Sequence, residues 1–297
     1  MTTGKVRQIK RRIESVDKIR QITRAMELVA TSKIKRAEDR IRAIGPYAQK
    51  IVEVMQNLST QVGILVHPLL EVHEPQINTG ILVLTSNRGL CGSFNSNVLR
   101  RAEELIREEQ AQGRNVKILV VGKKGLSYLR FRGYDIVESY LDISDAPTFE
   151  DARKLAEKLM DMYTNREIDL AYIVFNVFRT VAEQRSVIFK LFPLEKPPVA
   201  EEEEKVPKEY IFEPSPGEIA GALLPAYAET VTFRTLLGSA ASEHGARLTA
   251  MKAATDNSID MIGHLTLQFN RARQAQITQE ISEISGTAEA LKYAKHR

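Results

Sequence analysis

The residues best suited to chemistry lie in one turn, Thr85-Ser-Asn-Arg-Gly-Leu-Cys-Gly-Ser-Phe-Asn95. It follows an expected strand and precedes an expected helix, a place where α/β proteins often hold a phosphate. Cys91 could be a nucleophile if a base activated its thiol. The turn matches neither the GxxxxGKS/T nor the GxGxxG pattern, and no histidine lies near Cys91 in the sequence. We favour a tight strand-to-helix connection, and a histidine brought close by the fold is the alternative that stays open.

A second glycine-rich turn, Gly122-Lys-Lys-Gly125, also lacks the rest of a phosphate-binding loop. The single cysteine among 297 residues excludes an internal disulfide and a zinc site built from cysteines. The five histidines show no HExxH or comparable metal spacing. The sequence therefore predicts no catalytic constellation, no metal site and no cofactor.

Short apolar runs alternate with helical patterns between about residues 77 and 193. Ile77–Ser86 and Lys117–Gly122 suit buried parallel strands. The other expected elements are two helices and a strand pair: Asn95–Gln112, Pro147–Asn165, and Asp169–Arg179 with Arg185–Phe192. This alternation predicts a small Rossmann-like α/β sheet.

Residues 5 to about 60 carry apolar side chains at steps of three or four, which predicts one long helix. The stripe comprises Val6, Ile9, Ile13, Val16, Ile19, Ile22, Met26 and Val29. Some 40 residues of helix give a rod on the order of 60 Å long. Residues 1–42 hold 13 Lys and Arg against five Asp and Glu, so the chain's positive charge is concentrated here.

From about Ile219 to the end the helical pattern resumes, with weak points expected at Pro225, Gly238, Gly245 and Gly263. Its apolar stripe comprises Leu248, Met251, Ile259, Ile262, Leu265, Phe269, Ala272, Ile277, Ile281, Ile284, Ala288 and Leu291. A helix on the order of 100 Å long needs a partner helix to cover such a stripe. We therefore expect the two terminal helices to form a long antiparallel coiled coil, with the α/β domain inserted between them.

The expected divisions are 1–60 for the first helix, 61–217 for the central domain and 218–297 for the last helix. Residues 194–217 contain five of the 11 prolines and the run Glu201–Glu204, which indicates a solvated loop.

The longest apolar runs are too short to span a membrane. The net charge of +4 is small for this length, and no aromatic residues interleave with the basic ones for base stacking. We expect no binding to nucleic acid.

Several blocks resemble one family, the γ subunit of F-type ATP synthase. The first helix resembles that family's opening helix at Ile9–Val16 and Lys18–Ala30, and Ser86–Gly92 resembles its central signature. The C-terminal blocks are closer still: Ala241-Ser-Glu-His-Gly-Ala-Arg247, Met251-Lys-Ala-Ala-Thr-Asp-Asn257 and Asn270–Ile284. These blocks follow the family order from end to end of the chain.

The resemblance implies a rotor shaft that is not itself catalytic. In that family the terminal helices turn inside a ring of three α and three β subunits, with one shaft per complex. The α/β block contacts the ε subunit and the c ring, whose ion-driven rotation is coupled to ATP synthesis. The resemblance also implies a peripheral protein that meets the membrane only through the complex, on the cytoplasmic face of a bacterial inner membrane. The matrix face of the mitochondrial inner membrane is the alternative.

The resemblance also assigns residues. Rotor–stator coupling maps onto Met26, Arg247, Gln274, Thr278 and Glu280, and the signature turn contributes Arg88, Gly89, Cys91 and Gly92. The coupling residues are expected at the bearing surface, although Met26 could equally pack within the coiled coil. Tyr210-Ile-Phe-Glu-Pro214 resembles the foot that meets ε and the c ring, which points to Tyr210 and Glu213.

The chain departs from the family pattern in two places. It lacks the cysteine pair of plastid members, so no thiol regulation is expected, and the acidic stretch Lys196–Pro207 has no counterpart in that pattern. Two rival functions are a nucleotide-binding α/β enzyme with helical arms and a basic coiled-coil scaffold for nucleic acid. The first is weakened by the missing phosphate loop, and the second predicts steeply salt-dependent binding.

Overall fold

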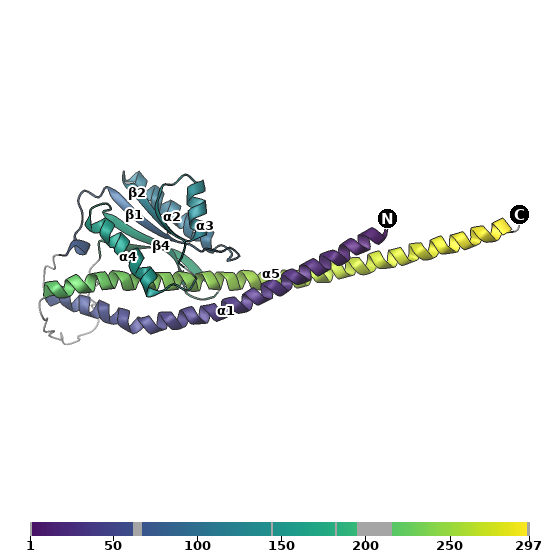
Figure 1. The fold of residues 1–297 in the computed structure, drawn as a ribbon, viewed down its shortest axis with the longest axis horizontal. Helices are drawn as coiled ribbons and strands as arrows, with labels where there is room; N and C mark the ends of the chain where they lie inside the picture. The colour runs from purple at the N-terminus through teal and green to yellow at the C-terminus, as the bar shows by residue number, and fades with distance from the viewer. Residues whose placement is uncertain (1, 62–66, 144, 182, 195–215, 296–297) are drawn as a thin grey trace. The chain divides into compact units, whose positions relative to one another are not determined.

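The computed structural model describes residues 2–61, 67–143, 145–181, 183–194 and 216–295 (Figure 1). Two long helices, α1 (Thr2–Gln61) and α5 (Pro216–Lys295), lie before and after a five-stranded sheet in the chain. The chain divides into two compact units. Residues 30–249 form one, which we call the domain unit, and residues 1–29 with 250–297 form the other, which we call the terminal unit.

The sheet of the domain unit has the strand order β3-β2-β1-β4-β5. The first four of these strands are parallel, and β5 runs antiparallel to β4. Buried strands such as Ile81–Leu84 are apolar throughout because both faces of the sheet are covered. The strands are β1 (Asn78–Leu84), β2 (Asn115–Val121), β3 (Ile136–Tyr140), β4 (Leu170–Phe178) and β5 (Gln184–Phe192).

Helices cover both faces of the sheet, and each face has its own hydrophobic core. On one face α2 (Phe94–Ala111) and α3 (Lys123–Phe131) pack against β1 and β2. On the other face α4 (Phe149–Thr164) and the first part of α5 form the larger core, which also includes Ile51 of α1. A short 3-10 helix, η1 (Pro68–Leu70), contributes Leu69 to that core.

The expected architecture of two terminal helices and an intervening Rossmann-like α/β domain is confirmed. The two expected helices and the antiparallel strand pair match α2, α4, β4 and β5 closely. No element was predicted over Ile136–Tyr140, which forms β3. This strand is short and lies at the sheet edge, so it is only partly buried and carries no continuous apolar run.

In the terminal unit, α1 and α5 lie side by side and run in opposite directions (Figure 1). The hydroxyls of Thr23 and Thr255 join the two helices through a buried hydrogen bond of 2.8 Å. Most covered positions follow steps of three and four, close to the 3.5-residue repeat of a left-handed coiled coil. They include Val6, Ile9, Ile13, Val16, Arg20, Thr23 and Met26 in α1, and Met251, Thr255, Ser258, Ile262, Leu265, Phe269, Ala272 and Gln276 in α5.

The apolar stripes expected from the sequence are therefore partly wrong. Several of their residues are exposed, with 43% to 71% of their surface accessible: Ile19, Ile22, Val29, Ile259, Ile277, Ile281 and Ile284. Polar residues such as Thr23 and Thr255 take covered positions instead. Ile19, Ile22, Val29 and Ile259 lie on faces turned away from the partner helix, whereas Ile277, Ile281 and Ile284 lie in the stretch 277–288 of α5, where every residue is exposed.

The expected weak points do not interrupt α5, which is continuous through Pro225 and through its internal glycines. Packing explains why a glycine stands at position 245 of this helix. A Cβ atom there would lie 3.1 Å from Phe178 of β4 and 3.1 Å from Gln184 of β5. No helix within the described ranges is long and apolar enough to cross a membrane.

Candidate functional site

The signature turn Ser86–Gly92 follows β1 and is held by its own hydrogen bonds. Asn95, at the start of α2, accepts from the Ser86 backbone N–H at 2.9 Å. The Ser86 hydroxyl donates to the Arg88 carbonyl at 2.6 Å. Leu90 and Gly92 have positive φ values of 63° and 54°. The turn is thus compact, and the side chains of Ser86 and Asn95 bond backbone groups that have no partner in the sheet or the helix.

Cys91 is buried inside this turn, with only 2% of its surface accessible. Burial raises the pKa of its thiol above the ordinary value, against the smaller effects of the Ser86 hydrogen bond and the Arg247 charge. Within the described part of the chain, the hydrogen-bond partners of its sulfur are Ser86, Asn95 and the Arg88 carbonyl, and none of these is a base. The geometry favours a structural thiol over a nucleophile.

The second glycine turn is packed against the first. The N-terminal N–H groups of α3 already have partners, since Lys123 donates to Asn87 Oδ1 at 3.0 Å and Gly125 to Thr85 Oγ1 at 2.9 Å. Gly122 has a φ of +96°, and a Cβ there would lie 2.3 Å from the Thr85 carbonyl oxygen. These glycines allow two loops to approach closely, so this helix terminus does not offer its N–H groups to a phosphate.

A cleft of about 300 Å³ opens at the carboxyl ends of β1 and β2, with α5 along one side. Apolar residues line part of it. Its charged residues are two cations and three carboxylates: Arg88, Lys123, Asp142, Asp145 and Glu243. This mixture of charges does not select a phosphate. The nucleotide-binding hypothesis therefore gains no support from the place where an α/β fold would bind its ligand.

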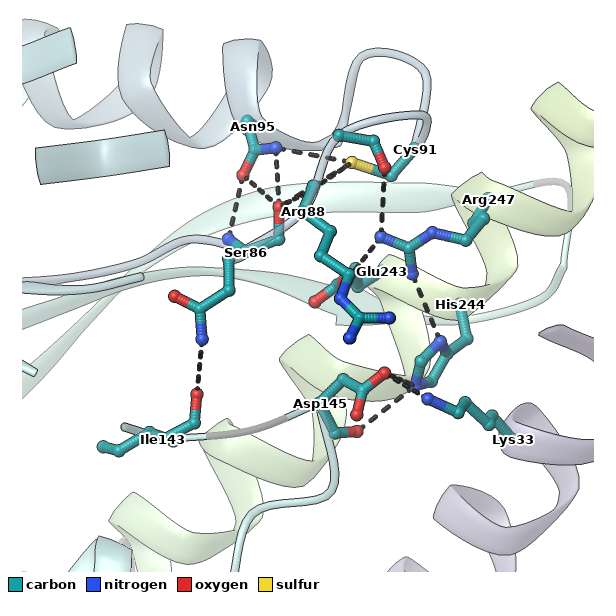
Figure 2. A network of polar contacts seen from close by, with 12 residues as sticks. Lys33, Ser86, Arg88, Cys91, Asn95, Ile143, Asp145, Glu243, His244 and Arg247 are labelled. Carbon is teal, nitrogen blue, oxygen red and sulfur yellow. Dashed lines mark hydrogen bonds and ion pairs between the residues drawn. The ribbon is translucent and has the colours of Figure 1, made fainter. Parts of the chain in front are cut away.

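Arg247 of α5 lies beneath the signature turn (Figure 2). Its guanidinium donates to Glu243 Oε1 at 2.6 Å, to the Gly89 carbonyl at 3.3 Å and to His244 Nδ1 at 3.4 Å. Only 8% of the residue's surface is accessible. The expectation that Arg247 is exposed is therefore wrong, and its assignment to coupling stays a prediction. This side chain joins α5 to the turn.

The contacts continue from His244 to the loop between β3 and α4. His244 Nε2 lies 3.2 Å from the Asp145 carbonyl oxygen, and the Asp145 carboxylate pairs with Lys33 of α1. The amide of Asn87 donates to the Ile143 carbonyl of the same loop at 2.9 Å. We call the group Lys33, Gly89, Asp145, Glu243, His244 and Arg247 the polar junction.

The protonation states within the polar junction follow from its geometry. The Asp145 carbonyl can only accept and Arg247 can only donate, so His244 carries its proton on Nε2 and is neutral. Burial lowers the pKa of His244 accordingly. Burial raises the pKa of Glu243, with Arg247 acting against it. Burial alone would raise the pKa of Asp145, but the Lys33 hydrogen bond and neighbouring positive charges lower it overall.

Sequence reasoning identified only Gly89 and Arg247 of this group. The spacing of Glu243 and Arg247 is i, i+4 on a helix, a visible sign of an ion pair. Lys33 and Asp145 are 112 residues apart, and Asp145 and His244 are 99 apart, so local pattern carries no sign of those contacts.

The other assigned residues have different surroundings. Met26 is half-buried on α1, and Arg88 is exposed at the signature turn. Gln274, Thr278 and Glu280 are exposed on α5, and Glu280 accepts a hydrogen bond from Gln276 at 2.8 Å. Tyr210, Glu213 and the stretch Lys196–Pro207 lie outside the described residues. The coupling and foot roles stay predictions.

Comparison with known proteins covers almost the whole chain. A family model described as ATP synthase matches residues 5–291. The chain is 44% identical to the ATP synthase gamma chain of Desulforamulus reducens over 96% of this chain and 99% of the relative. It is 43% identical to the ATP synthase gamma chain of Geobacter metallireducens, over 97% and 99%. It is 42% identical to that of Pelotomaculum thermopropionicum, again over 97% and 99%.

Two solved structures have a similar fold. A chain from the mitochondrial ATP synthase of Euglena gracilis, solved as an OSCP, F1 and c-ring assembly, aligns with a TM-score of 0.70. It shares 20% identity over 99% of this chain and 96% of that chain. A chain from the central stalk and c ring of Tetrahymena thermophila mitochondrial ATP synthase aligns with a TM-score of 0.58 and 23% identity. That match covers 78% of this chain and 99% of the other.

Proposed function

Because the chain belongs to the ATP synthase gamma chain family, we propose that it is the rotor shaft of an F-type ATP synthase. It couples ion-driven rotation of a c ring to ATP synthesis on the β subunits, and the reverse during ATP hydrolysis. The observation that carries this proposal is 44% identity to a gamma chain across 99% of that relative's length. A match of that extent includes both terminal helices as well as the central domain.

In this proposal the shaft binds no substrate and performs no bond chemistry. The buried thiol of Cys91 and the occupied N–H groups of α3 support that view. Its contribution is mechanical. Two stiff helices present different faces to three β subunits, and this asymmetry places the three sites in different states as the shaft turns.

The proposed partners are the ring of three α and three β subunits, the ε subunit and the c ring, with one shaft per complex. Gln274, Thr278 and Glu280 are proposed to contact the ring, which their exposure permits. Met26 is proposed to contact a β subunit, and Tyr210 with Glu213 to form the foot that meets ε and the c ring. The proposed location is peripheral, on the cytoplasmic face of a bacterial inner membrane, with the matrix face of mitochondria as the alternative.

The test is assembly. The purified chain is mixed with the α and β subunits of the same source, and the product is examined by native mass spectrometry and by ATP hydrolysis. We expect one copy of the chain per six-subunit ring and hydrolysis that depends on the chain. A folded helical chain that forms no such particle would overturn the proposal, and binding of DNA or RNA at physiological salt would then support the scaffold alternative.

A further inference from the structure

Asp145 occupies a position where three parts of the domain unit meet. It lies in the loop between β3 and α4, its carboxylate pairs with Lys33 of α1, and its carbonyl accepts from His244 of α5. Figure 2 shows Lys33 and His244 approaching it from the two different helices. One residue of the α/β domain therefore contacts both terminal helices.

The hydrogen bonds do not end at His244. Arg247 donates to His244 Nδ1 at 3.4 Å and also to the Gly89 carbonyl of the signature turn at 3.3 Å. The polar junction thus connects α1, the loop after β3, α5 and the turn after β1 through consecutive polar contacts. Its inner members are buried: His244 and Arg247 expose 2% and 8% of their surfaces.

The two ends of this network differ in strength. The Arg247–Glu243 pair is buried, whereas Lys33 and Asp145 keep 36% and 30% of their side chains accessible. A partly exposed ion pair contributes little to overall stability. The Lys33–Asp145 pair is therefore better suited to setting the position of α1 than to holding the fold together.

We propose that Asp145 is a positioning residue that links α1, through Lys33, to α5 and the α/β domain, so that both helices of the shaft turn together. This proposal rests on the proposed rotor function. A shaft loses work whenever one helix twists or slides while the other is driven. The link at Asp145 opposes such movement at the level where the α/β domain meets both helices.

Lys33 has an alternative use, since its accessible ammonium could bind an acidic surface of a partner subunit instead. The two roles make opposite predictions for a charge exchange. If Lys33 acts through Asp145, the double variant Lys33→Asp with Asp145→Lys restores the pair and its effect. If Lys33 acts on a partner, Lys33→Asp stays impaired whatever stands at position 145.

The test uses the complete ATP synthase in membrane vesicles, with ATP hydrolysis and ATP-driven ion uptake measured on the same preparation. The variants are Asp145→Asn, Lys33→Asp and the exchanged pair. For both single variants we expect unchanged complex content and a ratio of uptake to hydrolysis lower by about two- to fivefold, the range of one partly exposed ion pair. The exchanged pair should recover most of that loss.

Lys35→Asp is the matched control, because Lys35 is an exposed lysine on the same helix, two residues away. It should leave the ratio near that of the parent chain. The proposal is overturned if both single variants keep the parent ratio, or if the exchanged pair remains as impaired as Lys33→Asp. Failure of the parent chain itself to support ion uptake would instead count against the proposed rotor function.

Discussion

Arg247 and Thr278 lie on the same helix, α5, yet their surroundings are opposite. Arg247 belongs to the domain unit, where it is buried and its guanidinium contacts Glu243, His244 and Gly89. Thr278 belongs to the terminal unit, where it is exposed together with Gln274 and Glu280. The family resemblance assigns both to coupling, but Arg247 contacts other residues of its own chain, whereas Thr278 is exposed.

The same contrast holds for the two units as wholes. In the domain unit, helices are covered by a sheet and other helices, and buried polar groups have partners close by. In the terminal unit, α1 and the adjacent part of α5 are covered on one face, and every residue of α5 from 277 to 288 is exposed, including Ile281 and Ile284. Substitutions should therefore change the stability of the free chain mainly in the domain unit, and the behaviour of the complex mainly in the terminal unit.

The largest expected effect is at Arg247. Arg247→Met leaves the Glu243 carboxylate buried without its cation, which should lower the free energy of unfolding by about 3–5 kcal/mol. Urea unfolding of the full chain, followed by helical circular dichroism, measures it. The double variant with Glu243→Met should recover most of the loss, and the exposed Lys252→Met should change little. A loss at Arg247 no larger than at Lys252 would contradict the assignment.

The second prediction concerns pH and His244. Because burial lowers its pKa, the unfolded chain takes up a proton below its ordinary pKa of about 6.5 that the folded chain does not. This contribution makes the chain less stable as pH falls through that range. The raised pKa of Glu243 acts in the opposite direction but is present in both proteins compared. The stability advantage of the parent over His244→Gln should therefore shrink between pH 8 and pH 5.5.

Urea unfolding at several pH values measures this difference, and Gln is chosen because its amide can replace the Nε2 donor. Parallel curves for the two proteins would mean that His244 binds its proton equally in the folded and unfolded chains.

A smaller effect is expected at the buried hydroxyl pair of the terminal unit. Thr23→Val removes one partner of the Thr255 hydroxyl and should lower the free energy of unfolding by about 1 kcal/mol. The double variant with Thr255→Val should cost less than the sum of the two single changes, because each single change already removes the bond between the helices and leaves the other hydroxyl with only the carbonyl of its own helix. Thr266→Val is the control, since this exposed threonine makes the same bond to its own helix backbone. Strict additivity would argue against an interaction between the two hydroxyls.

The smallest effect on the free chain is expected at the exposed isoleucines. Ile284 exposes 71% of its surface, so Ile284→Ser should change the free energy of unfolding by less than about 0.5 kcal/mol. On the proposed rotor function, we expect Ile284 to contact the ring together with Gln274, Thr278 and Glu280 of the same exposed stretch of α5, so the same variant should reduce the ATP hydrolysis that the chain confers on α and β subunits. Parent-like hydrolysis would remove Ile284 from the proposed contact surface.

Much of the fold could be predicted because its signals are local. The apolar runs before Ser86 and Gly122 mark β1 and β2, and the long stretches of helical period mark α1 and α5. Which face of each terminal helix is covered was harder to predict from the sequence. Ile22 and Thr23 are neighbours, and sequence alone favoured the isoleucine, but the structure covers the threonine. A hydroxyl can be covered there because Thr255 supplies its partner from the other helix.

By itself the sequence determined the order of the elements apart from β3, the presence of two long terminal helices, the family and the absence of a recognisable phosphate loop. These depend on residue type and on spacing along a few turns of chain. Only the tertiary structure decided the surroundings of Arg247, the neutral state of His244 and the link through Asp145. Those properties arise between residues such as Gly89 and Arg247, which are 158 positions apart, and hydrogen bonds at that separation depend on how the whole chain folds.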